Sequence, residues 1–261
     1  MRIVTLNANG IRSAARKGFF AWVASQDADV IALQETRAQE HQLPGASALE
    51  GYRAFYVDAS RPGYSGVALY TRTEPREVVR TIGWPEADAE GRYVQADLGD
   101  LVVASVYVPS GTSGAARQAV KMNFLERFLG LLVTLRNTGR PYVVCGDYNI
   151  AHQAVDTFDP VRNAHVTGFF PEERAWMDDL TERAGWVDAF RVVNTEPKQY
   201  TWWPGWPKAY PNNLGWRIDY QMITPDLRAC VRAASIYKGE RFSDHAPVVI
   251  DYDLASAISS K

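Results

Sequence analysis

Polar and ionisable side chains stand at the ends of short apolar runs at several places in this 261-residue sequence. They are Asn7 after RIVTL, Glu35 after DVIALQ, Tyr107 after LVVASV, Asp147 and Asn149 at the end of PYVVCGDYN, Asp219 early in WRIDYQMI, and Asp244 and His245 before APVVI. Such runs predict buried strands, and a rigid scaffold presents reactive groups where its strands end. We therefore expect these residues to meet at one rim of the fold.

The residue types in this set favour metal-assisted hydrolysis of a phosphoester. Carboxylate and amide oxygens without cysteine are hard ligands, which suit Mg²⁺ or Mn²⁺. Asp219 can orient the imidazole of His245, and Asp147 can accept a proton from an attacking water. Tyr107 and Asn149 can donate hydrogen bonds to a phosphoryl oxygen or a leaving group. The sequence has no Gly-rich phosphate loop, no serine nucleophile elbow and no zinc-type His/Cys cluster.

Each of these residues also has a purely structural interpretation when it is taken alone. Asn and Asp after strands commonly form turns, and Glu35 alone would be an ordinary surface acid or ion-pair partner. Tyr107 alone would be an aromatic residue at the edge of the core. His245 beside an acid would be a structural histidine whose hydrogen bonds are satisfied within the fold. The joint pattern favours a site, because turns do not require this combination of residue types.

Short β-rich runs alternate irregularly with helical segments along the whole chain. The expected strands are RIVTLN, DVIALQE, GVALYT, RYVQADL, LVVASVYVP, PYVVCGDYN, WRIDYQMIT and APVVIDYD. Helices are expected at Ser13–Gln26, at Ala115–Asn137 with Val120, Phe124, Phe128, Leu132 and Leu135 on one face, and at PEERAWMDDLTERAG up to Gly185. We predict one α/β domain over residues 1–261, in which helices flank two packed sheets.

Charge and cysteine content narrow the possible classes of protein. A net charge of -2 argues against a protein that coats nucleic acid through bulk charge, but not against local phosphate binding. Residues 1–26 contain Arg2, Arg12, Arg16 and Lys17 and no acid, which suits either a solvated helix face or a phosphate-facing patch. Two isolated cysteines and the lack of any apolar run near the ~20 residues of a membrane span favour a cytoplasmic protein.

Tryptophan is concentrated in the irregular segment YTWWPGWPKAYPNNLGWRID, in which no acid occurs between Glu196 and Asp219. Such a loop can be a small aromatic core, or it can lie against DNA without repelling phosphate and line a pocket for a nucleotide. We expect Trp202 and Trp216 to shape a pocket and Trp203 and Trp206 to hold the loop in place.

An ordered series of motifs runs from Arg2 to Asp253: LNANGIRS, LQETRAQ, GYSGVALYTR, EGRYVQAD, VYVPSG, VVCGDYNIAH, GFFPEER, YTWW, GWRIDYQM and FSDHAP. In this series the chain resembles the exonuclease III family of Mg²⁺-dependent DNA repair nucleases, which includes AP endonucleases. The resemblance implies a four-layer αββα sandwich with the site at one end of two mixed sheets. It also implies Mg²⁺, replaceable by Mn²⁺, and duplex DNA with 3' ends, nicks or abasic sites as the partner of a monomer.

The resemblance also implies individual roles. Glu35 would be the principal metal ligand with Asn7 beside it and Asp244 at a second position, and Asp147, Asn149 and His245 would complete the surroundings of the metal. Asp147 would activate water, Asn149 would hold water and phosphate, His245 with Asp219 would stabilise developing charge, and Tyr107 would lie at the scissile phosphate. DNA contacts are expected from Arg12, Lys17, Tyr64, Ser110 and Arg217, and pocket walls from Trp202, Trp216 and Ile218.

Some positions depart from the family's pattern. Ser110 replaces an Asn that is expected to contact DNA, Asn9 stands where some members have an acid, and DTFDPVRNAHVTGFF brings His165 near the PEER motif. The expected activities are 3'-to-5' exonuclease, removal of 3'-phosphates and incision 5' to abasic sites. Loops such as DTFDPVRNAHVTGFF govern whether an abasic nucleotide is accepted, and Trp202 is larger than the aromatic that the family often has there, so we expect 3'-end processing to exceed abasic-site incision slightly. There are two alternatives. One is a phosphoesterase that acts on a phospholipid or inositol phosphate, and the other is a catalytically silent nucleic-acid-binding module.

Overall fold

Two six-stranded β-sheets pack face to face in the computed structural model, which describes residues 1–43 and 45–255. The strand order of the first sheet is β11 (Val231–Ile236), β12 (Val248–Tyr252), β1 (Arg2–Asn7), β2 (Val30–Gln34), β4 (Val67–Thr71) and β3 (Arg53–Val57). The strand order of the second is β5 (Glu77–Val79), β6 (Tyr93–Asp97), β7 (Val102–Tyr107), β8 (Tyr142–Asp147), β10 (Asp219–Ile223) and β9 (Val187–Asp188).

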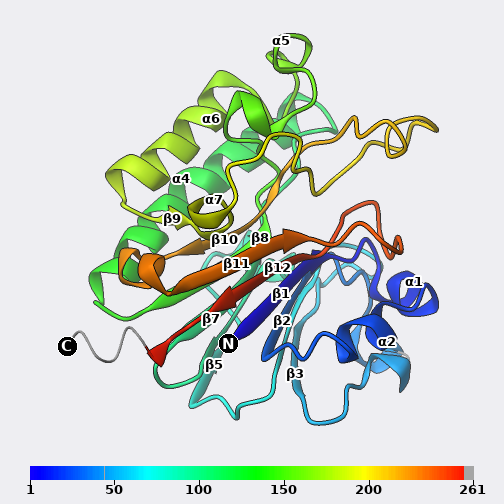
Figure 1. Ribbon diagram of the computed structural model, residues 1–261, viewed down its shortest axis with the longest axis vertical. Coiled ribbons are helices and arrows are strands. Elements are labelled where there is room, and N and C mark those ends of the chain that lie inside the picture. Colours follow the sequence, from blue (N-terminus) through cyan, green and yellow to red (C-terminus); the bar gives the residue numbers. More distant parts are fainter. Residues whose placement is uncertain (44, 256–261) are drawn as a thin grey trace.

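Helices cover the outer face of each sheet (Figure 1). They are α1 (Ile11–Arg16), α2 (Phe19–Ala24), α3 (Pro85–Ala89), α4 (Ala115–Asn137), α5 (Pro160–Asn163), α6 (Pro171–Asp178) and α7 (Ala189–Val193). Short 3₁₀ turns occur at Glu40–Gln42, Gly45–Ser47, Ala154–Asp156 and Pro225–Cys230, and a π turn at Asp179–Arg183 extends α6. The predicted four-layer αββα sandwich is therefore confirmed.

Three apolar clusters separate the four layers. The central cluster joins the facing sides of the sheets, with Ile3 and Val30 from the first sheet and Val103 and Val143 from the second. The second cluster packs α4 and α6 on the outer face of the second sheet. The third packs α1 and α2 on the first sheet. The strands in the middle of each sheet are thus buried on both faces, and for this reason their sequences are continuous apolar runs.

Each sheet has one parallel pair of strands near its centre. Strand β1 runs parallel to β2, with Asn7 opposite Gln34, and β7 runs parallel to β8, with Tyr107 opposite Asp147. The other paired strands are antiparallel. The carboxyl ends of both parallel pairs therefore carry the polar residues that the sequence places after its apolar runs.

The predicted elements agree with the structure, with corrections. Every predicted strand forms, but β3, β5, β9 and β11 were not predicted because their sequences are short or largely exposed. The single helix expected at Ser13–Gln26 is wrong: Gly18 has a φ of 88° and divides it into α1 and α2. Helix α4 has the predicted bounds, although Val120 is 45% exposed and does not join the buried face.

Cys145 and Cys230 are both buried. Among the described residues, the helices are all too short or too polar to cross a bilayer.

Candidate active site

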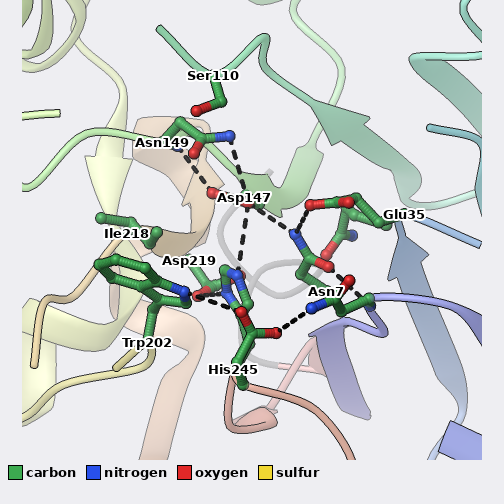
Figure 2. A network of polar contacts seen from close by, with 12 residues as sticks. Asn7, Glu35, Ser110, Asp147, Asn149, Trp202, Ile218, Asp219 and His245 are labelled. Carbon is green, nitrogen blue, oxygen red and sulfur yellow. Dashed lines mark hydrogen bonds and ion pairs between the residues drawn. The ribbon is translucent and has the colours of Figure 1, made fainter. Parts of the chain in front are cut away.

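The polar residues after the parallel strands converge between the ends of the two sheets (Figure 2). Asn7 ends β1 and Glu35 directly follows β2, while Tyr107 ends β7 and Asp147 ends β8. Asp219 begins β10 and pairs with Asp147 across the antiparallel ladder. The topology therefore explains why residues more than two hundred positions apart in the sequence lie at one rim.

Two residues of this rim have left-handed backbone conformations. Glu35 has a φ of 49° and Asn149 a φ of 54°, which is uncommon for residues other than glycine. Each stands just beyond the end of its strand, where the chain leaves the sheet. Non-glycine residues persist in this region when their surroundings fix them, and such residues concentrate at functional sites.

Asn7 is the central hydrogen-bond donor of the cluster. Its Nδ2 donates to Glu35 Oε1 at 2.9 Å and to Asp147 Oδ2 at 2.8 Å, and its Oδ1 accepts the amide of Asn9 at 2.9 Å. Arg37 forms an ion pair with the other oxygen of Glu35. The sequence did not predict this role of Arg37. Its position two residues after Glu35 in LQETRAQ could have indicated that it pairs with Glu35.

His245 and Asp219 form the predicted pair. His245 Nδ1 lies 2.8 Å from Asp219 Oδ2, and the opposite ring nitrogen lies 3.9 Å from Asp147 Oδ2. All three residues are buried. The imidazole is thus held between two carboxylates, one of which fixes its orientation.

Burial and charge perturb both titratable groups that face each other here. Burial raises the pKa of Asp147 to about 7; the charges of Asp219 and Glu35 add to this effect, whereas His245 and Asn7 oppose it. Burial lowers the pKa of His245, but the charge and hydrogen bond of Asp219, together with Asp147 and Asp244, outweigh it and raise the value to about 10. Perturbed groups of opposite kind in contact are typical of functional sites.

A cavity of about 290 Å³ opens over this cluster. Glu35, Asp147, His245 and other residues of the cluster line one side, and Trp202, Trp216 and Ile218 line another, as expected for the pocket walls. The indole Nε1 of Trp202 donates to Asp244 Oδ2 at 3.1 Å, and its ring meets Trp216 edge-on at 6.3 Å between centroids. Both interactions hold the ring of Trp202 in place.

The carboxylates of this cluster fit a divalent cation, whereas a charged His245 has no free lone pair to offer one. One ligand atom from each of Asp147, Asp219 and His245 lies within 4.8 Å of the others, and Asp219 Oδ1 is buried without a hydrogen-bond partner. A buried carboxylate oxygen without a donor is costly, and a bound cation would satisfy it. Of the other predicted ligands, Asp244 accepts hydrogen bonds from Asn9 Nδ2 at 2.7 Å and Ser243 Oγ at 3.1 Å. The metal roles of Asn7, Glu35, Asn149 and Asp244 stay predictions.

The residues predicted to contact DNA lie in different surroundings. Arg12 and Lys17 are exposed at α1, and Ser110 lies at the cavity. Tyr64 is half-buried, and its hydroxyl accepts hydrogen bonds from Arg92 at 3.0 Å and from Arg117. Their contacts with DNA stay predictions.

The prediction that Arg217 binds DNA is wrong. Its side chain is 1% exposed and pairs with Asp156 at 2.8 Å and Asp188 at 2.7 Å. Trp216 and Ile218 flank Arg217 and face the cavity. Because neighbours along an extended chain face opposite sides, Arg217 must point into the protein.

The expectation that Trp206 packs to hold the loop holds only in part, because its ring meets Phe158 edge-on at 6.5 Å between centroids but is 54% exposed. Trp203 is 1% exposed and packs with Tyr210 and Ala209, as expected. His165 is exposed and does not line the cavity, whereas its neighbours Val166, Thr167 and Gly168 do. The loop thus has one structural indole, two that form the pocket and one that faces solvent.

Comparisons with known proteins agree with this architecture. The chain belongs to the endonuclease/exonuclease/phosphatase family, whose model matches residues 4–245. It is similar to an exodeoxyribonuclease of Bacillus subtilis, with 36% identity over 250 residues that cover 95% of this chain and 98% of the relative.

Two solved structures extend the comparison. An AP endonuclease from Archaeoglobus fulgidus has a TM-score of 0.89 at 26% identity and covers 97% of this chain and 99% of its own. The 3' phosphatase NExo from Neisseria, bound to a product DNA hairpin, has a TM-score of 0.88 at 25% identity, with coverage of 97% of this chain and 99% of its own.

Proposed function

We propose that this protein is a metal-dependent phosphodiesterase of DNA repair that acts on duplex DNA. Its activities would be 3'-to-5' exonuclease, removal of 3'-phosphates and incision 5' to abasic sites. The observation that carries the proposal is the buried trio of Asp147, His245 and Asp219 beside a cavity with aromatic walls. The relatives named exodeoxyribonuclease, AP endonuclease and 3' phosphatase support it.

The side chains of the site can divide the chemistry among them. Asp147 accepts the proton of the attacking water, and its raised pKa suits it to take up a proton near neutral pH. His245 is charged because Asp219 holds its pKa high, so it stabilises the negative charge that develops on the phosphate. Asn149, whose amide is held by Val108 O at 2.9 Å and faces Asp147, positions water and phosphate.

Mg²⁺, or Mn²⁺ in its place, would be held by Glu35, Asn7 and the carboxylates around Asp147, and would supply charge neutralisation at the phosphate. Tyr107 would donate a hydrogen bond at the scissile phosphate. Burial raises the pKa of its hydroxyl well above the ordinary value, and the charges of Glu35 and Asp147 raise it further, so the hydroxyl keeps its proton.

The cavity walls would receive the terminal nucleotide or abasic sugar. Trp202, Trp216 and Ile218 offer apolar surface for the sugar or base, while Ser110 and Asn149 offer polar groups at the same cavity. Because Trp202 is fixed by Trp216 and Asp244, a bulky wall restricts the space, which favours 3'-end processing over abasic-site incision. The protein would work as a monomer with a single domain in the cytoplasm.

A comparison of three labelled duplexes tests the proposal. One carries an abasic-site analogue, one a recessed 3'-hydroxyl and one a 3'-phosphate, and each is incubated with Mg²⁺ or with EDTA. We expect cleavage that EDTA abolishes, fastest at 3'-modified ends. Cleavage that survives EDTA would refute metal dependence. A lack of cleavage in all three would favour the catalytically silent module, and activity on inositol phosphate alone would favour the phosphoesterase, which the DNA-directed relatives do not support.

A further inference from the structure

Lys121 in α4 is a fully buried cation close to the candidate site. Its Nζ donates to Glu173 Oε1 at 2.5 Å and to the backbone carbonyl of Asn149 at 2.8 Å. Lys121 and Glu173 both have side chains with no solvent exposure. A buried ion pair is weak evidence for stability, because desolvation offsets much of the attraction between its charges. The geometry of this pair therefore calls for another explanation.

Glu173 holds the segment that forms one edge of the cavity. Its Oε2 accepts the backbone amides of Gly168 at 2.6 Å and Phe170 at 2.9 Å. Its Oε1 also accepts Gln118 Nε2 at 3.0 Å, and Gln118 in turn accepts the hydroxyl of Thr167 at 2.8 Å. Helices α4 and α6, which carry this pair, lie together on the outside of the second sheet (Figure 1). The cavity edge is thus tied to both helices.

The same edge packs against Asn149 and against a pocket wall. A Cβ on Gly168 would lie 3.1 Å from the carbonyl oxygen of Asn149 and 3.1 Å from the ring of Trp216, and Gly168 has a φ of 94°. The amide of Ala151 donates to the carbonyl of Gly168 at 2.8 Å. The Asn149 carbonyl is therefore close both to Lys121 Nζ and to the backbone of Gly168.

We propose that Lys121 and Glu173 are positioning residues, whose buried ion pair keeps the Asn149 peptide and the Thr167–Gly168 edge of the cavity in one fixed arrangement. The proposal rests on the proposed nuclease function. Asn149 connects the pair to the reacting groups, because its backbone amide donates to Asp147 Oδ1 at 2.8 Å. A shift of this peptide would move the Asn149 side chain relative to Asp147.

Two consequences separate positioning from ordinary stabilisation. Displacement of Asn149 lowers kcat for every substrate, because small misplacements of reacting groups slow chemistry by tenfold to about 10²-fold. Displacement of the cavity edge raises KM most for the substrate whose nucleotide must enter the cavity. If the pair merely stabilised the fold, its removal would lower the melting temperature. It would leave kcat and KM unchanged at temperatures well below the melting temperature.

The test uses Lys121→Met and the double variant Lys121→Met/Glu173→Gln, which removes both charges of the pair together. Leu132→Ala is the matched control, because Leu132 is a buried residue of the same helix with no role in the site. Melting temperature, kcat and KM are measured at 25 °C with the 3'-phosphate and abasic-site duplexes. Hydrogen–deuterium exchange of the segments 147–151 and 164–170 is followed in parallel.

We expect the double variant to lose about tenfold in kcat on both duplexes and to exchange faster in both segments. The Leu132→Ala variant should melt earlier and keep its kcat. A double variant with kcat within twofold of the parent and unchanged exchange overturns the proposal, as does an equal loss in the control. If the parent protein cleaves neither duplex, the proposed function fails, and the exchange measurement alone decides whether the pair holds these segments.

Discussion

The substitution Asp219→Asn tests whether a charged imidazole takes part in the reaction. Asn has about the same size as Asp and keeps a polar group beside His245. In the parent protein His245 Nδ1 lies 2.8 Å from Asp219 Oδ2. The change removes the negative charge that does most to raise the pKa of His245. The backbone of residue 219 stays fixed by its strand pairing with Asp147, so the substitution should alter charge more than geometry.

The expected size of the effect follows from the pKa of His245. At a pKa of about 10 the imidazole is almost fully charged at neutral pH. Without Asp219 we expect the pKa of His245 to fall toward its ordinary value, because burial lowers it and only the charges of Asp147 and Asp244 remain to raise it. In the limit of the ordinary value of 6.5, about one molecule in ten carries the charge at ~pH 7.5, so the rate falls by up to about tenfold. The loss should shrink as the pH is lowered.

The assay is kcat/KM on the 3'-phosphate duplex between ~pH 6 and ~pH 9, expressed as the ratio of parent to variant. The ratio cancels the ionisations that both proteins share; that of Asp147 is not among them, because the charge of Asp219 helps to raise its pKa. We expect the ratio to rise with pH. The control is Asp251→Asn, which makes the same chemical change at a half-buried aspartate of β12 that pairs with Arg2 of β1. It should leave the ratio near one. A ratio below threefold that does not vary with pH would refute a catalytic role for charged His245.

Three other substitutions test separate parts of the structure. Asp147→Asn should abolish turnover and keep DNA affinity, because an amide cannot take the proton; measurable cleavage would remove Asp147 from its role as base. Trp206→Ala should raise the Kd for duplex DNA about fivefold or more in an EDTA-containing anisotropy assay, with an unchanged melting temperature, and an unchanged Kd would show that the exposed ring does not meet DNA. Asp156→Asn should lower the free energy of unfolding by at least about 2 kcal/mol at neutral pH, because Arg217 and Arg191 outweigh burial and lower the pKa of Asp156 to about 2. This stability is present above the unfolded pKa of 3.8 and is lost as the pH falls through about 2, so urea unfolding curves should converge in acid.

The positions of the site residues could be predicted because the strands end where the apolar runs end. Asn7, Glu35, Tyr107 and Asp147 each lie within one residue of a strand end that the sequence marks clearly. The pairing of β1 with β2 and of β7 with β8 in parallel brings these ends to one rim. Local patterns alone could not give this pairing, and the family resemblance supplied only the expectation that the site lies at one end of two packed mixed sheets.

Side-chain partners that are distant in sequence could not be predicted. Arg217 looked like a DNA-binding residue because it stands in an acid-free basic segment. Its partners Asp156 and Asp188 belong to other elements, and only the fold brings them beneath the pocket. The alternation of Trp216, Arg217 and Ile218 did carry a usable signal, since both neighbours were expected to face the cavity.

The buried pair of Lys121 and Glu173 was missed for a related reason. Lys121 stands in a helix whose apolar positions were expected at Val120 and Phe124, so a charged residue beside them suggested the exposed face. In the structure Val120 is exposed and Lys121 is buried. The buried face of α4 keeps Phe124, Phe128 and Leu132 as predicted. Near the start of the helix Lys121 takes the buried position in place of Val120, because the Asn149 carbonyl and Glu173 accept its hydrogen bonds there.

Substrate preference should depend on the size of Trp202 and not on its mobility. The ring is held at its edge by Trp216 and at its Nε1 by Asp244, so rotation out of the cavity would break the hydrogen bond to a carboxylate. A Phe at this position would keep the wall, enlarge the cavity and leave Asp244 with donors from Asn9 and Ser243 only. The wall and the acidic cluster are thus coupled through one indole nitrogen, and a change at Trp202 should alter both the acceptance of abasic sites and the chemistry beside them.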